Sequence, residues 1–264
     1  MLGEFAMTER CAAPKITLRR SALRSFAGAL WLMIFGVVVG GFSAESRAAT
    51  PPPQPFHAEY DVVWKGINAG TSTLELTRDP ANGWIYISRN VARGLFKLAL
   101  PGEILQRSRF ALDNGQPRPK QYSADDGTSD TSRDVDLRFD WTSGRVRGTS
   151  EGKPVDLAIR ENLQDPMSVQ IALMQALAAG EQPQRFFLAD KDEIKEFLYE
   201  LEAPLRLATA LGELDTVVYG TRRPGSDRVT RLWLAPSLGY VPVQAERRRG
   251  TKLEWSMRIR TLKR

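Results

Sequence analysis

The sequence predicts a mainly β protein, in which one antiparallel, strongly curved sheet or partial barrel wraps around one long helix at about residues 166–179. Two observations predict it. Runs of alternating apolar and polar residues recur from Phe56 to the C-terminus with turn residues between them, which is typical of antiparallel strands. One segment instead has helical spacing and is apolar over most of its circumference, so several surfaces must cover it.

The first 48 residues have the pattern of a secretory signal peptide. Several cations between Lys15 and Arg24 precede an apolar run, Ala27 to Phe42, and small residues follow it. We expect cleavage after Ala48 and release into the periplasm. The alternative is an uncleaved anchor in the inner membrane, which the run disfavours because it is shorter than the ~20 residues that span a bilayer comfortably.

Charge and cysteine content exclude several classes of protein. Cys11, the only cysteine, lies in the leader, so the exported chain has no disulfide and no thiolate nucleophile. Six Lys/Arg and three Asp/Glu also lie in the leader, so half of the formal net charge of +6 leaves with it. The small remainder predicts solubility rather than a nucleic-acid partner.

Residues 49–55, ATPPPQP, predict a disordered or extended spacer before a single β domain at residues 56–264. The first strand places Ala58, Tyr60, Val62 and Trp64 on one face. Further strands are predicted at residues 71–78, 84–93, 104–112, 133–141, 145–150, 153–159, 193–202, 215–222, 228–236, 240–248 and 253–262.

The predicted helix has recognisable ends. Asp165 suits the N-cap, Pro166 suits the first helical position, and Gly180 suits the position just past the C-cap. The helix divides the strands into an N-terminal and a C-terminal set.

Six aspartates lie between residues 124 and 141, and they raise the question of a metal site. On a strand, Val135, Leu137, Phe139 and Trp141 point one way, and Asp134, Asp136 and Asp140 point the other. The remaining three, Asp125, Asp126 and Asp130, lie in DDGTSD, which does not match a calcium-binding loop. The pattern favours a solvated strand face over a metal site, so no metal and no cofactor is expected.

Catalytic groups are sparse. His57, the only histidine, lies at the start of the first strand, where an exposed structural role is favoured over a zinc site or a catalytic triad. Walker-type phosphate-binding motifs are absent. Two carboxylates would suffice for a glycosidase, but no spacing identifies a pair. An enzyme is therefore the weaker interpretation, and no catalytic residue is assigned.

Aromatic residues predict the candidate site. Large rings on the concave face of a curved sheet are either plain core or the lining of an apolar cavity. The candidate ligand-binding residues come from three strands, and they are Trp141, Phe139, Leu137, Trp255, Met257 and Trp233.

Several segments together resemble one family. They are AEYDVVWKGINAGTSTLEL, SRNVARGLFKL, ADDGTSDTSRDVDLRFDW, DPMSVQIALMQALAAG, RVTRLWLAPSLGYVPV and KLEWSMRIRTLKR. They are similar to exported bacterial proteins of domain of unknown function family 3108, from about Phe56 to the C-terminus, and that family implies no activity. The hairpin at 233–243 is also similar to one in periplasmic lipoprotein carriers, which implies an incomplete barrel with an apolar cavity.

Three functions stay open. The first is a non-enzymatic periplasmic protein that binds an apolar or amphiphilic envelope molecule. The second is an envelope scaffold or interaction protein with a filled core, which would use sheet edges or the basic run at 246–249. The third is a carboxylate-dependent glycan hydrolase. The expected partners are a lipid or amphiphile or an envelope protein, with membrane contact only through the signal segment before its cleavage.

Overall fold

A computed structural model describes residues 50–99 and 102–264. The predicted signal peptide and the first residue of the predicted spacer lie outside the described residues. Within the described part, no helix is both long and apolar enough to cross a membrane.

The described residues form one 15-stranded sheet. Its N-terminal arm comprises β1 (Phe56–Trp64), β2 (Ile67–Asp79), β3 (Gly83–Ala92), β4 (Glu103–Asp113), β5 (Gln116–Asp125), β6 (Val135–Asp140), β7 (Arg145–Ser150) and β8 (Lys153–Ala158). Its C-terminal arm comprises β9 (Leu163–Gln164), β10 (Arg185–Asp190), β11 (Glu193–Thr209), β12 (Gly212–Arg222), β13 (Arg228–Ala235), β14 (Val241–Arg249) and β15 (Lys252–Lys263). The helical elements are α1 (Phe96–Ala99), η1 (Thr131–Arg133), α2 (Ser168–Ala178) and η2 (Pro236–Leu238).

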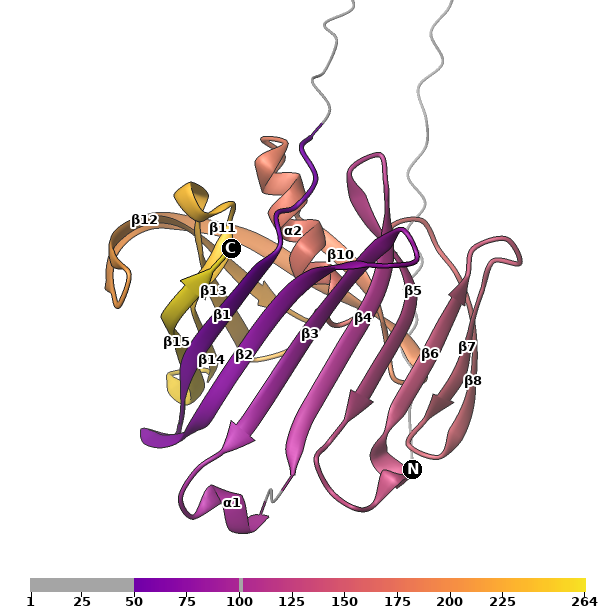
Figure 1. Ribbon diagram of the computed structural model, residues 1–264, viewed down its shortest axis with the longest axis horizontal. Coiled ribbons are helices and arrows are strands. Elements are labelled where there is room, and N and C mark those ends of the chain that lie inside the picture. The colour runs from indigo at the N-terminus through magenta and orange to yellow at the C-terminus, as the bar shows by residue number, and fades with distance from the viewer. Residues whose placement is uncertain (1–49, 100–101) are drawn as a thin grey trace, which may run out of the picture. The chain divides into compact units, whose positions relative to one another are not determined.

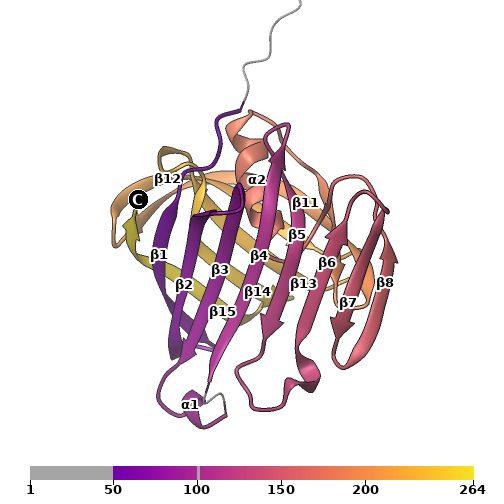
Figure 2. The same cartoon turned by 45° about the vertical axis from the view of Figure 1, so that its right-hand side comes forward.

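Strands β1 to β8 form one meander and β10 to β15 another, and the two arms meet where β1 pairs antiparallel with β15. Figures 1 and 2 show the arms curving away from this junction on either side of α2. Strands β8 and β9 are the two edges, so the sheet does not close. Neighbouring strands are antiparallel except β9 and β10, which are parallel. The prediction of a mainly antiparallel, open, barrel-like sheet is confirmed.

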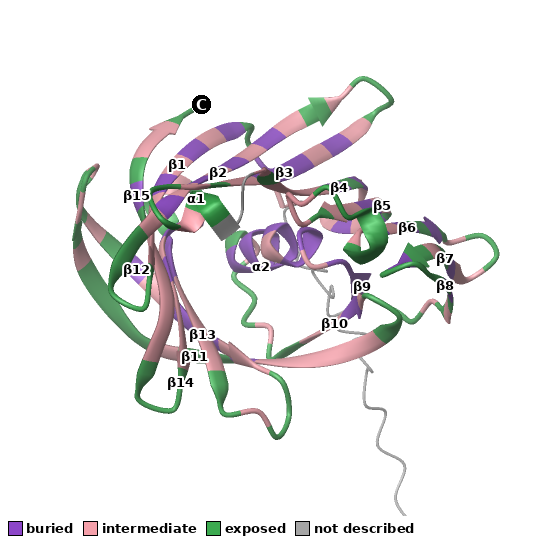
Figure 3. Cartoon of the chain, turned by 90° about the horizontal axis from the view of Figure 1, so that it is seen from below, coloured by how far each residue is buried: buried purple, intermediate pink, exposed green. Residues whose placement is uncertain are grey.

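The prediction of one long helix with the sheet wrapped around it is wrong. Helix α2 has 11 residues, and residues 166–167 form a turn before it. The Asp165 carboxylate accepts hydrogen bonds from the N–H groups of Met167 and Ser168 at 2.8 Å each, in the manner of an N-cap. The first turn is irregular, because the N–H of Gln170 bonds to the carbonyl of Met167, three residues back, and the regular helix begins at Ser168. At only about 16 Å long, α2 lies between the arms (Figure 3) at the end of the sheet opposite α1 (Figure 1).

The far end of α2 stops as the sequence predicts. Gly180 has φ 75°, and its N–H bonds to the carbonyl of Leu177. The N–H of Glu181 bonds to the carbonyl of Ala176, which completes the pair of bonds that ends many helices at a glycine. The glycine is required because a side chain at this φ would be strained.

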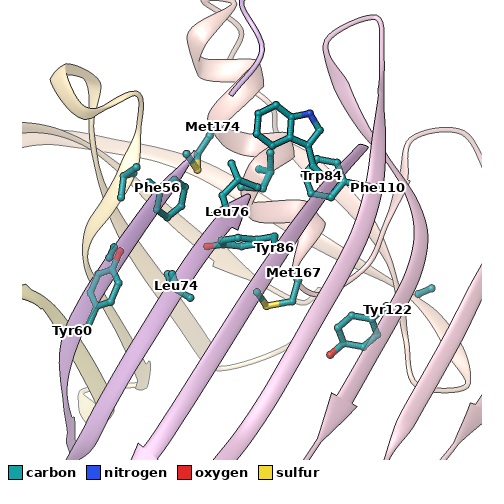
Figure 4. Close-up of a cluster of buried hydrophobic side chains, with 14 of the residues drawn as sticks. Phe56, Tyr60, Leu74, Leu76, Trp84, Tyr86, Phe110, Tyr122, Met167 and Met174 are labelled. Atoms are coloured by element: carbon teal, nitrogen blue, oxygen red, sulfur yellow. The ribbon is translucent and has the colours of Figure 1, made fainter. Parts of the chain in front are cut away.

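The core lies on two sides of α2. Met167, Ile171 and Met174 pack with the aromatic residues of β1 to β5, which Figure 4 shows around Tyr86 and Trp84. The opposite side of the helix packs against β10 to β13 through three residues, Val169, Leu173 and Leu177. Because both faces are buried, α2 joins the two arms near the end of the sheet that carries the start of β1.

Strand β5 was not predicted, because its sequence contains Pro117 and Pro119. Proline cannot donate a backbone hydrogen bond, so it is usually confined to strand edges. The structure obeys this rule, since β6 pairs only with residues 121–124 of β5 and leaves the proline half as a local edge. Side chains satisfy the exposed carbonyls there, with Gln164 Nε2 2.9 Å from Pro117 O and Trp141 Nε1 2.6 Å from Pro119 O.

The proline-rich segment before β1 is extended and docked onto the domain. Its described part, residues 50–55, has no regular secondary structure. Gln175 donates to the carbonyl of Pro51 at 3.1 Å, and Arg264 donates to the side chain of Gln54 at 2.8 Å. Pro53 is buried.

Candidate functional site

The end of the sheet that α2 does not fill contains an apolar pocket of about 760 Å³. Strands β1 to β4, β15 and α1 contribute to it, and its larger apolar side chains are Val62, Trp64, Val91, Phe96, Ile104 and Trp255. Thr71 and Asn90 are the polar residues in its lining. The volume lies within the range typical of small-molecule sites.

The aromatic wall of the pocket is built by strand register. Trp64 and Trp255 are direct partners in the β1–β15 pairing. Phe96 packs edge-to-face on Trp64, with ring centroids 5.6 Å apart and planes at 84°. Such a geometry is favourable for aromatic pairs and holds the rings in place before any ligand enters.

Close approach of β2 and β3 shapes the pocket floor. A Cβ added to Gly70, whose φ is 155°, would lie 2.0 Å from the carbonyl oxygen of Val91. Ala92 is the register partner of Gly70, and Val62 is its partner on the other side. Only glycine permits this close approach between two strands that both line the pocket.

Two cations flank the tryptophans. Lys65 Nζ lies 4.1 Å from the centre of the Trp64 ring, and the Arg247 guanidinium lies 5.4 Å from that of Trp255. Arg247 donates to Thr230 Oγ1 at 3.0 Å, and no carboxylate of the described residues lies within ion-pair distance of it. Burial lowers the pKa of Arg247, with Glu254 opposing that shift. A half-buried guanidinium without a paired carboxylate favours an anionic group nearby.

One of the six candidate ligand residues, Trp255, lines this pocket. Leu137 and Phe139 are buried in the main core, and Trp141 and Met257 pack against it. Trp233 is also buried there, and its indole Nε1 has no hydrogen-bond partner among the described residues. The assignment of these five residues to a ligand site stays a prediction.

Sequence reasoning missed Trp64, Val62 and Phe96 as site residues. Trp64 and Val62 were placed correctly on the apolar face of the first strand. The available signal was the pair Leu95-Phe96, whose apolar side chains follow the end of β3 at Ala92 and belong to no strand.

The aspartate-rich segment is a solvated strand face, as predicted. On β6, Val135, Leu137 and Phe139 are buried, while Asp136 is half-buried and Asp140 is exposed. Thr128 and Ser143 hydrogen bonds lower the pKa values of Asp126 and Asp140 respectively.

Three carboxylates of this region, Asp125, Asp126 and Asp134, offer oxygens within 4.8 Å of one another. Desolvation, and then repulsion from the other two, raises the pKa of Asp134. Arg133 lies 3.0 Å from Asp126 and neutralises part of the charge. Three ligand atoms are fewer than the six to eight that calcium takes, so the cluster by itself is not a complete calcium site.

The only histidine does not form a catalytic arrangement with the acid beside it. His57 Nε2 is 3.7 Å from Glu59 Oε1, and both side chains are more than a third exposed. This contact is a solvated one at the start of β1, which agrees with the structural role that the sequence favoured.

Comparison with solved structures shows the fold. The chain is similar to a β-barrel-like protein of domain of unknown function DUF1849 from Brucella abortus, with a TM-score of 0.54 and 14% identity over 80% of this chain and 98% of that one. It is also similar to a "putative exported protein" with a YmcC-like fold from Bacteroides fragilis, with a TM-score of 0.33 and 11% identity over 81% of this chain and 98% of that one. A search of curated proteins finds no significant match.

A family model described as "Protein of unknown function (DUF3108)" matches residues 59–250. That range runs from β1 to the end of β14 and contains most of the pocket wall. The chain therefore belongs to the DUF3108 family.

Proposed function

We propose that this protein is exported to the periplasm and binds an apolar or amphiphilic envelope molecule in the pocket at the open end of its sheet. The observation that carries the proposal is the pocket itself, about 760 Å³ with an almost entirely apolar lining. Its cause is physical, because α2 is too short to fill both ends of the space between the arms. Export rests on the signal-peptide pattern of residues 1–48.

The chemistry of the lining supports binding rather than catalysis. Thr71 and Asn90 are its polar residues, and no carboxylate or histidine contributes to it. The half-buried Arg247 beside Trp255 favours an amphiphile with an anionic head group, whose acyl chain would lie along the tryptophans.

A direct test is titration of the mature chain with a fluorescent acyl-chain probe such as cis-parinaric acid. Ala92→Phe places a ring opposite Gly70 and fills the pocket, so probe affinity should fall by about tenfold or more, since the ring takes the space of several buried methylenes. Ala208→Phe is the matched control, because Ala208 is exposed near the tip of the β11–β12 hairpin. Equal affinities of wild type and Ala92→Phe, with both folded, would exclude this pocket as the site.

A further inference from the structure

The pocket end of the sheet carries the most exposed large apolar side chains of the described residues. Leu95 and Leu98 are 82% and 84% exposed, and Ile67 is 61% exposed. Trp64 and Val91 are 41% and 44% exposed at the same end. Seven such exposed residues occur in the described part, and these five belong to the β1–β2 turn or to residues 91–98. Clustering of this kind marks an interaction surface.

The two segments form one surface, which we call the rim. The backbone N–H of Arg93 donates to the carbonyl of Ala69 at 2.8 Å, and Phe96 packs on Trp64. Figures 1 and 2 show α1 and the turn between β1 and β2 at the same end of the sheet. Trp64 and Phe96 also line the pocket, so the rim borders its opening.

The charge of the rim has a single sign. Lys65, Arg93 and Lys97 are exposed, and none of them has an ion-pair partner among the residues that the structure describes. The sequence contains no Asp or Glu between Asp61 and Glu75 or between Asp79 and Glu103.

The bordering acids are already paired. Asp61 lies 3.7 Å from Arg260, and Glu103 lies 3.5 Å from Arg89. Glu254, whose backbone carbonyl accepts from Lys65, pairs with Arg228 at 3.0 Å. The rim cations are therefore not neutralised by these neighbours.

We infer that the rim docks on an anionic lipid surface, where the pocket exchanges its ligand. Exposed leucines and a tryptophan interleaved with Lys and Arg match the chemistry of interfacial membrane binding, in which apolar tips enter the acyl boundary and cations meet anionic head groups. A second copy of this chain fits less well, because the same three cations would face each other across a symmetric interface. This adds a membrane contact of the mature chain to the one expected from the signal segment.

The exchange step rests on the proposed function, but docking does not. Docking is measured by co-sedimentation of the mature chain with phosphatidylcholine vesicles that contain or lack phosphatidylglycerol. Wild type should bind the vesicles with phosphatidylglycerol and bind the neutral ones more weakly. Replacing Lys65, Arg93 and Lys97 by Gln should lower affinity for the anionic vesicles by about fivefold per cation.

The apolar contribution is tested with matched pairs. Leu95→Glu with Leu98→Glu should lower vesicle binding by at least about tenfold, because two apolar tips become charged. Leu201→Glu with Leu205→Glu is the control, since these β11 leucines are 46% and 49% exposed away from the rim. Binding that is absent in wild type, indifferent to phosphatidylglycerol, or lost equally in the control would overturn the docking proposal.

Probe titration of the same variants separates the two proposals. None of the five substituted rim residues lines the pocket, so affinity for cis-parinaric acid should stay within about twofold of wild type. Probe binding without vesicle binding would refute docking and leave the proposed function standing. Vesicle binding without probe binding would refute the proposed function and leave docking standing.

A second copy of the chain as the occupant is tested by sedimentation equilibrium. A wild-type dimer that Leu95→Glu and Leu98→Glu dissociate would identify a second copy as the occupant and overturn the lipid assignment.

Discussion

Trp64 and Trp255 are direct cross-strand partners, although they come from opposite ends of the β domain. Both line the apolar pocket, and Phe96 packs edge-to-face on Trp64. The two tryptophans of the pocket therefore come together only where the first and last strands of the domain pair. Ligand binding and the pairing of β1 with β15 should be lost together on unfolding.

Two half-buried tryptophans allow a controlled comparison. Trp255→Ala should lower affinity for an acyl-chain probe by about tenfold or more, because it removes a large apolar surface from the pocket. Trp141→Ala should leave that affinity unchanged, since Trp141 instead donates to Pro119 O and stacks under Arg118. Trp141→Ala should instead lower the free energy of unfolding, measured in urea, by about 1–3 kcal/mol. The reverse ranking of the two affinities would move the site toward Trp141.

Arg247 tests the head group of the ligand. Arg247→Gln keeps a donor for Thr230 but removes the charge beside Trp255. Affinity for a probe with a carboxylate head should fall severalfold, while affinity for the corresponding alcohol should stay the same. Equal losses for both probes would mean that Arg247 acts only on packing.

Asp165 predicts a specific pH dependence of stability. Its buried carboxyl accepts from Ser108 Oγ at 2.6 Å and from two backbone N–H groups, but burial dominates and raises its pKa to about 6. A folded pKa above the unfolded one means that the folded state holds the proton more tightly. The contribution of Asp165 to the free energy of unfolding is thus most favourable below about pH 4 and is lost as the pH rises to about 6. The free energy of unfolding should fall by about 3 kcal/mol across this range because of Asp165.

Asp165→Asn removes this dependence, because the amide does not titrate and can still accept from the turn. The difference in unfolding free energy between wild type and variant, measured in urea at a series of pH values, should change by that amount across the window and stay constant above it. Parallel pH profiles of the two proteins would contradict the assignment.

A substitution at Gly70 tests the close approach of β2 to β3 beside the pocket. Gly70→Ala should destabilise the protein by about 3 kcal/mol or more, because its Cβ would collide with the carbonyl of Val91 in the adjacent strand. Gly66→Ala is the control, since its φ of 85° is also positive but no atom lies within 4 Å of the added Cβ. The control should lose only about 1 kcal/mol, the cost of the backbone conformation. Thermal unfolding of both variants checks the ranking.

Alternation and turn residues were sufficient to predict most strands and the open antiparallel sheet. They failed at β5, because its two prolines argue against a strand. In the structure, the carbonyls of these prolines accept hydrogen bonds from the side chains of Trp141 and Gln164. They also failed at β9 and β10, because the sequence of these strands shows no alternation that would predict their short parallel pairing. Local signals describe each strand face, whereas pairing partners are set by tertiary contacts.

The pocket could not be located from the sequence for a related reason. Its position follows from the length of α2 and from its place between the two arms, whereas the residues around Asp165 predict only that a helix starts there. The aromatic prediction identified Trp255 but gave equal weight to core residues such as Phe139. Burial of a ring and lining of a cavity have the same sequence pattern.

Native mass spectrometry of the mature protein, purified from the periplasm without detergent and followed by organic extraction, tests the occupancy of the pocket most directly. We expect a bound species with the mass of an acyl-chain amphiphile in wild type, retained in Ala208→Phe and absent from folded Ala92→Phe. A clean apoprotein mass for wild type, together with no uptake of an added fatty acid, would contradict the binding function.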